Sequence, residues 1–96
     1  MSRTRYLISY DICNPRRLRR VARALEGFGV RLQYSLFECP LDPMRLAEVR
    51  AALHSILNHD EDQVLFVALG PAVNDASKCI AVMGVPYSQR TAVTII

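Results

Sequence analysis

The sequence predicts an α/β or α+β domain in which two helices cover one face of a β-sheet. Segments with the alternating pattern of strands occur before, between and after two segments with the apolar spacing of helices. Each helical segment is also preceded by a polar capping residue and a proline. No repeat or linker interrupts the chain, so its 96 residues are expected to form a single domain, 1–96.

The first strand is expected from about Arg3 to Asp11, where apolar or aromatic residues occupy alternate positions. Asn14 and Pro15 then form a plausible cap and first residue of a helix, and Gly27 and Gly29 end it. The remaining helix surface is rich in arginine. The apolar stripe of this helix consists of Leu18, Val21, Ala22, Leu25 and Phe28.

The segment Val30–Leu41 has a strand pattern throughout and contains no glycine or asparagine turn, so the pattern alone predicts one long strand. Asp42 and Pro43 start a second helix by the same cap-and-proline arrangement. Its apolar stripe consists of Leu46, Val49, Leu53, Ile56 and Leu57.

The apolar run Val64–Leu69 is typical of a central, buried strand. Weaker strands are expected at Cys79–Met83 and Ala92–Ile96. Two helices on one sheet face leave the other face open, and a chain this short cannot cover it alone. A partner subunit is therefore expected, with the last strand available to pair outside its own chain.

The net charge of +3 conceals an uneven distribution. Residues 1–31 contain eight arginines and two acidic residues, whereas residues 32–96 contain four basic and seven acidic residues. Five of these arginines lie within eight positions of the first helix, without an acidic residue among them, which favours contact with a polyanion over a solvated helix face. The candidate nucleic-acid-binding residues are Arg16, Arg17, Arg19, Arg20, Arg23 and Arg31.

Asp11 is the acidic residue of this basic half with a special position, because it ends the first strand. It is either a cap of the turn before the helix or a ligand of Mg²⁺ or another divalent cation, and a two-fold axis nearby would supply a second carboxylate. Three aromatic residues near the arginines, Tyr10, Tyr34 and Phe37, either belong to the core or stack on bases.

The other polar groups indicate no site. Three cysteines, at positions 13, 39 and 79, suggest neither disulfides nor zinc and are expected to be buried or half-buried, while His54 and His59 read as a solvated pair. No apolar run is long enough to span a membrane, and the amino-terminal residues lack a signal-peptide pattern. A cytoplasmic location is therefore expected.

Three stretches of sequence resemble the CRISPR-associated protein two family. They are Tyr6–Ile12, Arg17–Ala22 and Leu25–Cys39, and the strand ending in Tyr-Asp-Ile followed by Gln-Tyr-Ser-x-Phe-Glu is specific in combination. The resemblance implies a ferredoxin-like βαββαβ fold, with Val30–Leu41 forming two short strands instead of one. It also implies a homodimer in which the last strand completes the partner's sheet.

The resemblance assigns Asp11 to a divalent metal at the dimer axis. It places Tyr10, Arg20, Arg31 and Phe37 at positions linked to nuclease activity, and a further basic position falls on either Arg17 or Arg19. Family members act in spacer acquisition either as metal-dependent endonucleases on single-stranded RNA or double-stranded DNA, or as non-catalytic bridges between dimers of the integrase, CRISPR-associated protein one. Two other readings remain: a toxin-like ribonuclease of the virulence-associated protein D type, and a small-molecule regulatory domain.

Overall fold

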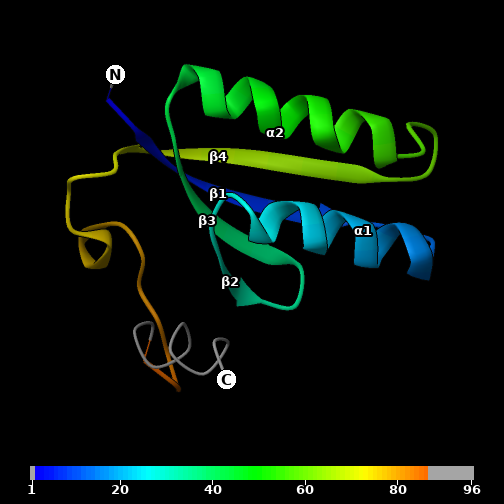
Figure 1. Cartoon of the computed structure of the whole chain (residues 1–96). Helices are drawn as coiled ribbons and strands as arrows, with labels where there is room; N and C mark the ends of the chain where they lie inside the picture. The colour runs from blue at the N-terminus through cyan, green and yellow to red at the C-terminus, as the bar shows by residue number, and fades with distance from the viewer. Residues whose placement is uncertain (1, 87–96) are drawn as a thin grey trace.

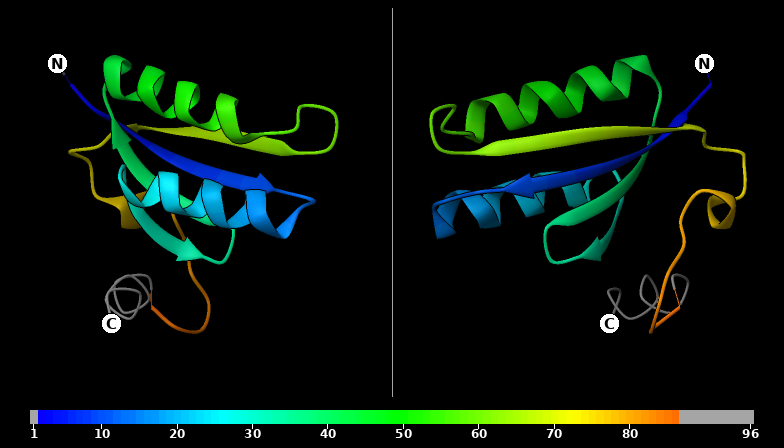
Figure 2. Two further views of the ribbon diagram at one scale, coloured as in Figure 1. Left: turned by 45° about the vertical axis from the view of Figure 1, so that its right-hand side comes forward. Right: turned by 180° about the vertical axis from the view of Figure 1, so that it is seen from behind.

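The computed structural model describes residues 2–86 and places the elements in the order β1-α1-β2-β3-α2-β4. Their bounds are β1 Thr4–Asp11, α1 Pro15–Glu26, β2 Val30–Gln33, β3 Leu36–Leu41, α2 Pro43–Ile56 and β4 Gln63–Pro71, with a short 3₁₀ turn at Ala76–Lys78. The four strands form one antiparallel sheet in the order β2-β3-β1-β4. Both helices lie on the same side of this sheet (Figures 1 and 2), which is the ferredoxin-like arrangement.

Both helices begin where the sequence predicts. The side chain of Asn14 accepts hydrogen bonds from the backbone N–H groups of Arg16 and Arg17, and that of Asp42 accepts one from Arg45. Pro15 and Pro43 occupy the first helical positions, where a missing N–H group has no consequence. The caps therefore fix the register with which each apolar stripe meets the sheet.

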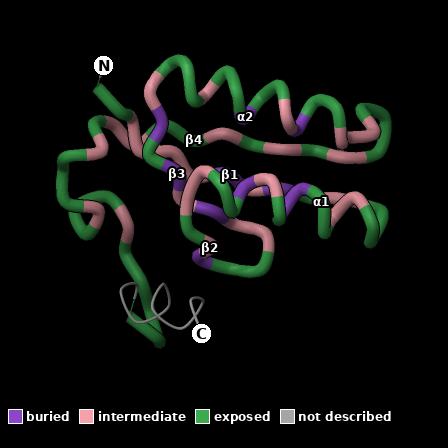
Figure 3. The backbone as a smooth tube through the Cα atoms, viewed as in Figure 1, coloured by how far each residue is buried: buried purple, intermediate pink, exposed green. Residues whose placement is uncertain are grey.

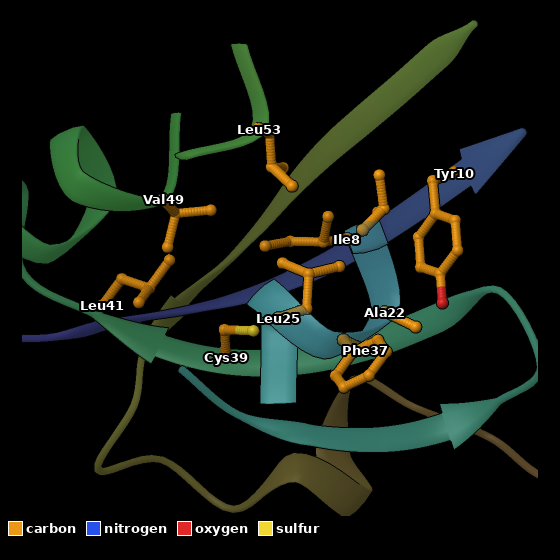
Figure 4. Close-up of a cluster of buried hydrophobic side chains, with 10 residues drawn as sticks. Ile8, Tyr10, Ala22, Leu25, Phe37, Cys39, Leu41, Val49 and Leu53 are labelled. Atoms are coloured by element: carbon orange, nitrogen blue, oxygen red, sulfur yellow. The ribbon is translucent and has the colours of Figure 1, made fainter. Parts of the chain in front are cut away.

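The core fills the space between the helices and the sheet (Figures 3 and 4). Its fully enclosed members come from β1, α1, β3 and α2, and the remaining residues of the two predicted stripes are half-buried against them. The buried side chains are Ile8, Tyr10, Val21, Ala22, Leu25, Phe37, Cys39, Leu41, Val49 and Leu53. The binary pattern of the sequence thus locates this core correctly.

The prediction of one long strand at 30–41 is wrong, and the two strands implied by the resemblance are confirmed. β2 and β3 form a hairpin whose turn, Tyr34 and Ser35, contains no glycine. Two hydrogen bonds from Tyr10 hold this turn: its N–H donates to the Ser35 carbonyl and its hydroxyl to the Tyr34 carbonyl, both at 3.1 Å. Because a residue of a distant strand stabilises this turn, the turn itself needs no glycine or asparagine that would mark it in the sequence.

Of the later strand predictions, the strand at Val64–Leu69 is confirmed as β4 but its central, buried position is wrong, and the strand at Cys79–Met83 is wrong. Within residues 2–86, β4 lies at the edge of the sheet and not at its centre, and Leu65 and Val67 are 50% and 45% exposed. The segment Cys79–Met83 is not a strand; its apolar side chains instead face a hollow of about 630 Å³ shared with Leu7 and Leu36. The predicted strand Ala92–Ile96 lies outside the described residues.

The face of the sheet that no helix covers is called the open face below. Side chains alternate along a strand, so the core-facing Ile8 and Tyr10 place Leu7, Ser9 and Asp11 on the open face. The register of the ladder then adds Leu36 and Glu38 from β3 and Leu65 and Val67 from β4. Apolar side chains at the edge strand thus remain exposed to solvent in the single chain.

Gly29 is required where the connection after α1 passes β3. A Cβ atom there would lie 2.1 Å from the carbonyl oxygen of Glu38 and 2.6 Å from the sulfur of Cys39. We therefore expect Gly29→Ala to lower the free energy of unfolding by about 1–3 kcal/mol or more, measured by urea denaturation. Gly27→Ala is the matched control, because its Cβ would approach only the Ala24 carbonyl at 3.5 Å. Equal stability of the two variants would contradict this account.

Candidate functional site

Asp11 ends β1 on the open face, and its side chain is exposed. Its backbone pairs with Gln63 in the ladder, but within residues 2–86 its carboxylate has no hydrogen-bond or ion-pair partner. Because this carboxylate accepts no hydrogen bond from the turn that follows β1, the alternative in which Asp11 caps that turn is wrong; α1 itself is capped by Asn14. An acidic side chain at a strand end with no structural contact is available to bind a ligand.

The residues of one chain fit a metal ion only in part. No group of three His, Cys, Asp or Glu side chains in the described part of the chain could enclose a metal ion. Mg²⁺ commonly retains several waters and binds through one or two carboxylates, so one Asp11 per chain is compatible with a site shared by two chains. His54 and His59 contact each other, with ring centroids 4.5 Å apart, and both are exposed as predicted.

The loop between β1 and α1 is fastened by Asp62, which precedes β4. Its carboxylate, fully enclosed, accepts hydrogen bonds from the backbone N–H groups of Cys13 and Asn58, both at 2.9 Å. It also pairs with Arg17, whose Nε lies 2.7 Å from Oδ2. The hydrogen bond from Arg17, joined by those from the two backbone groups, lowers the pKa of Asp62 well below its usual range.

Arg17 is thereby engaged within the protein. Its guanidinium reaches Asp62 and, through Nη2, Glu61 at 2.9 Å, and the hydrogen bond to Asp62 raises its pKa. Four other predicted nucleic-acid-binding residues of α1 are exposed and have no side-chain partner among the described residues. They are Arg16, Arg19, Arg20 and Arg23.

Three of the predicted catalytic residues are brought together on the core side of the sheet. Tyr10 and Phe37 are 4% and 0% exposed, with ring centroids 6.2 Å apart (Figure 4). The guanidinium carbon of Arg31 lies 5.4 Å from the centroid of Phe37. Asp11 points to the other face, and Arg20 lies on the outer surface of α1. A single chain therefore does not assemble the predicted catalytic set on one face.

The core interpretation holds for Tyr10 and Phe37 but not for Tyr34, which is 71% exposed. The cysteine prediction is correct only for Cys39, whose enclosed position raises the pKa of its thiol to about 12; Cys13 and Cys79 are exposed. None of the helices in residues 2–86 is long and apolar enough to cross a membrane.

Sequence reasoning missed Asp62, because it lies in a polar turn that reads as solvated. The order of the strands could have indicated its role. In an antiparallel arrangement the end of β1 and the start of β4 meet at one edge of the sheet, as the pairing of Asp11 with Gln63 shows. Acidic residues immediately before β4 therefore face the arginine-rich start of α1.

These features define a small ferredoxin-like protein with an arginine-rich first helix and an unpaired carboxylate at the end of its first strand. The chain belongs to the family described as CRISPR associated protein Cas2, whose model matches residues 4–75. This assignment agrees with the resemblance found in the sequence, and the matched residues include all four strands of the sheet.

Relatives and solved structures support this assignment. The chain is 51% identical over 69 residues to the CRISPR-associated endoribonuclease Cas2 of Geobacter sulfurreducens, covering 72% of this chain and 73% of that protein. It is 42% identical to CRISPR-associated endoribonuclease Cas2 2 of Nitrosomonas europaea, over 74% of this chain and 63% of that protein. The crystal structure of Streptococcus pyogenes Cas2 at pH 6.5 superposes with a TM-score of 0.74 and 28% identity, covering 83% and 99% of the two chains.

Proposed function

We propose that this chain is a homodimeric, divalent-cation-dependent endonuclease of CRISPR spacer acquisition that binds nucleic acid through the arginines of α1. The observation that carries the proposal is the Asp11 carboxylate, exposed on the open face and without a partner in residues 2–86. Relatives at 51% and 42% identity carry the name endoribonuclease, which favours RNA as the cleaved polymer. The family also makes spacer acquisition the preferred context over a toxin or a small-molecule regulator.

The residues of the chain have separable roles in this proposal. Two copies of Asp11, one from each subunit, hold Mg²⁺ or another divalent cation. When bound, the cation supplies a more acidic water and charge stabilisation at a phosphodiester. The arginines at positions 16, 20 and 23 recur every three or four residues and so share one side of α1, where they hold the polymer by its phosphates. The ion pair of Arg17 with Asp62 keeps the loop after Asp11 in place.

A homodimer is supported by the open face. Leu65 and Val67 are about half exposed, and one carboxylate oxygen of Glu38, which pairs with Arg5, is buried without a hydrogen-bond partner among residues 2–86. We expect the protein to sediment as a dimer at micromolar concentration, and Val67→Lys to convert it to a monomer. Met44→Lys on α2, at an exposed position away from this face, should stay dimeric. A monomeric wild type, or a dimeric Val67→Lys variant, would contradict the proposal.

The alternative is a non-catalytic scaffold that binds duplex DNA between dimers of the integrase, CRISPR-associated protein one. One observation favours it: Tyr10 and Phe37, linked to nuclease activity by resemblance, are buried in the core on the face opposite Asp11. Incubating the protein with single-stranded RNA and duplex DNA, with Mg²⁺ or with EDTA, separates the two functions. Cleavage only with Mg²⁺ supports the endonuclease, and binding without cleavage supports the scaffold.

Binding through exposed arginines should be salt-dependent and indifferent to sequence. Each phosphate contact on duplex DNA contributes about 0.9 to the slope of log affinity against log salt. We expect Arg20→Gln and Arg23→Gln each to reduce this slope by about one contact in a fluorescence anisotropy titration. Arg17→Gln should reduce it less, because that guanidinium is already paired with Asp62. Arg50→Gln on α2 is the control, and an unchanged slope in the two α1 variants would refute this interface.

A further inference from the structure

Tyr34 occupies the turn between β2 and β3 and presents its ring to solvent. It is 71% exposed and is the only mainly exposed phenylalanine or tyrosine among residues 2–86. A large aromatic surface in water carries a hydrophobic cost that a bound ligand would relieve. The proposed function, which uses only Asp11 and the arginines, gives this ring no role.

The turn beneath Tyr34 is held firmly. The Tyr10 hydroxyl donates to the Tyr34 carbonyl and the Tyr10 N–H to the Ser35 carbonyl, both at 3.1 Å. Tyr10 itself is buried in the core, beside Phe37. The backbone that carries the exposed ring is therefore tied to the centre of the sheet, which reduces the ordering required when a ligand binds.

The positively charged guanidinium of Arg31 lies over the Tyr34 ring. The guanidinium carbon of Arg31 is 5.9 Å from the centroid of Tyr34 and 5.4 Å from that of Phe37, so this group contacts both an exposed and a buried ring. The Nε of Arg31 is buried and has no hydrogen-bond partner in the part of the chain that the structure describes. An aromatic face directed to solvent beside a guanidinium suits a flat, electron-rich ring attached to a phosphate.

We propose that Tyr34, supported by Arg31, is a stacking site for an unpaired base of single-stranded nucleic acid. Bases within a duplex are stacked on their neighbours and do not offer a free face, whereas single strands are commonly bound on exposed aromatic side chains next to positive charge. This inference rests on the proposed function in assuming that the protein binds nucleic acid. It adds the place on this chain where one unpaired base of the strand is held by its ring.

The test measures binding by fluorescence anisotropy in EDTA, so that no cleavage occurs. The probes are a labelled single-stranded oligouridylate, an abasic oligonucleotide of the same length, and a duplex. Stacking of one base on an aromatic side chain contributes about 1–3 kcal/mol, which corresponds to a weakening of about 5- to 150-fold. We expect Tyr34→Ala to weaken oligouridylate binding by this factor and to leave abasic and duplex binding unchanged. Tyr34→Phe should bind like the wild type, as should Met44→Ala, which alters an exposed apolar side chain on α2.

Several results would overturn the stacking site. They are unchanged oligouridylate binding by Tyr34→Ala, equal loss on the abasic probe, or equal loss in Tyr34→Phe. Dissociation of a wild-type dimer by Tyr34→Ala would identify the ring as a contact with a second copy of the chain instead. If the wild type binds no nucleic acid, the proposed function itself fails together with this site. If the wild type binds nucleic acid in a salt-dependent manner and every variant binds each of the three probes with the wild-type affinity, the stacking site alone is removed.

Discussion

Asp11→Asn is expected to reduce divalent-cation-dependent cleavage of single-stranded RNA by at least about 100-fold, in the range found when a group that activates a nucleophile or stabilises charge is removed. Asparagine keeps the shape of the side chain but removes its charge. Because the carboxylate has no partner in residues 2–86, folding should be unchanged. In a dimer the variant also removes repulsion between two like charges, which should leave stability equal or slightly higher.

Gel-resolved cleavage with Mg²⁺ and thermal denaturation together check this prediction. Binding to duplex DNA through the α1 arginines provides the internal control, since it should survive the substitution. Loss of the fold would mean that Asp11 has a structural role that the described residues do not reveal. Full activity in the variant would show that Asp11 is not the group on which cleavage depends.

Asp62→Asn should destabilise the protein more than any substitution of an exposed polar residue. Its carboxylate is enclosed and joins three segments: the loop after β1 through Cys13, the start of α1 through Arg17, and the start of the loop after α2 through Asn58. An asparagine cannot accept all of these hydrogen bonds, and it leaves the Arg17 guanidinium without its main partner. We expect the melting temperature to fall by roughly 5–15 °C.

The acid dependence of stability tests the same contact. The pKa of Asp62 is lower in the folded protein than its ordinary value of 3.8, so the folded state favours the charged form. Its contribution to stability is present above about pH 4 and is lost as the pH falls below that value. The Asp62→Asn protein should therefore lose less stability between pH 5 and pH 3 than the wild type. Glu61→Gln, at a half-exposed position that also contacts Arg17, should have a small effect. Parallel pH profiles for wild type and Asp62→Asn would refute the assignment.

The sequence predicted what depends on local pattern. Asn14 and Asp42 cap their helices and Pro15 and Pro43 begin them, because these effects involve residues only two or three positions apart. Alternation along β1 correctly divided Ile8 and Tyr10 from Asp11. The same alternation already implied that two predicted catalytic residues, Tyr10 and Asp11, lie on opposite faces of the sheet.

What the sequence did not predict depends on contacts between distant segments. The turn at Tyr34 and Ser35 is stabilised by Tyr10, 24 residues away from Tyr34, so no turn residue marks it. The role of β4 as an edge strand follows from strand order, which an apolar run cannot reveal. The pairing of Arg17 with Asp62 could be predicted only by knowing that the end of β1 and the start of β4 lie side by side. This pairing separates Arg17 from the exposed arginines with which it was grouped.

The stoichiometry of divalent-cation binding tests most directly whether two chains share a site built on Asp11. Titration of the purified protein with Mn²⁺, followed by isothermal calorimetry, is expected to give about one ion for every two chains, because each chain supplies one carboxylate. The Asp11→Asn protein should show no such binding while sedimenting as the wild type does. One ion bound per chain, or binding retained in Asp11→Asn, would contradict a metal site shared across the dimer.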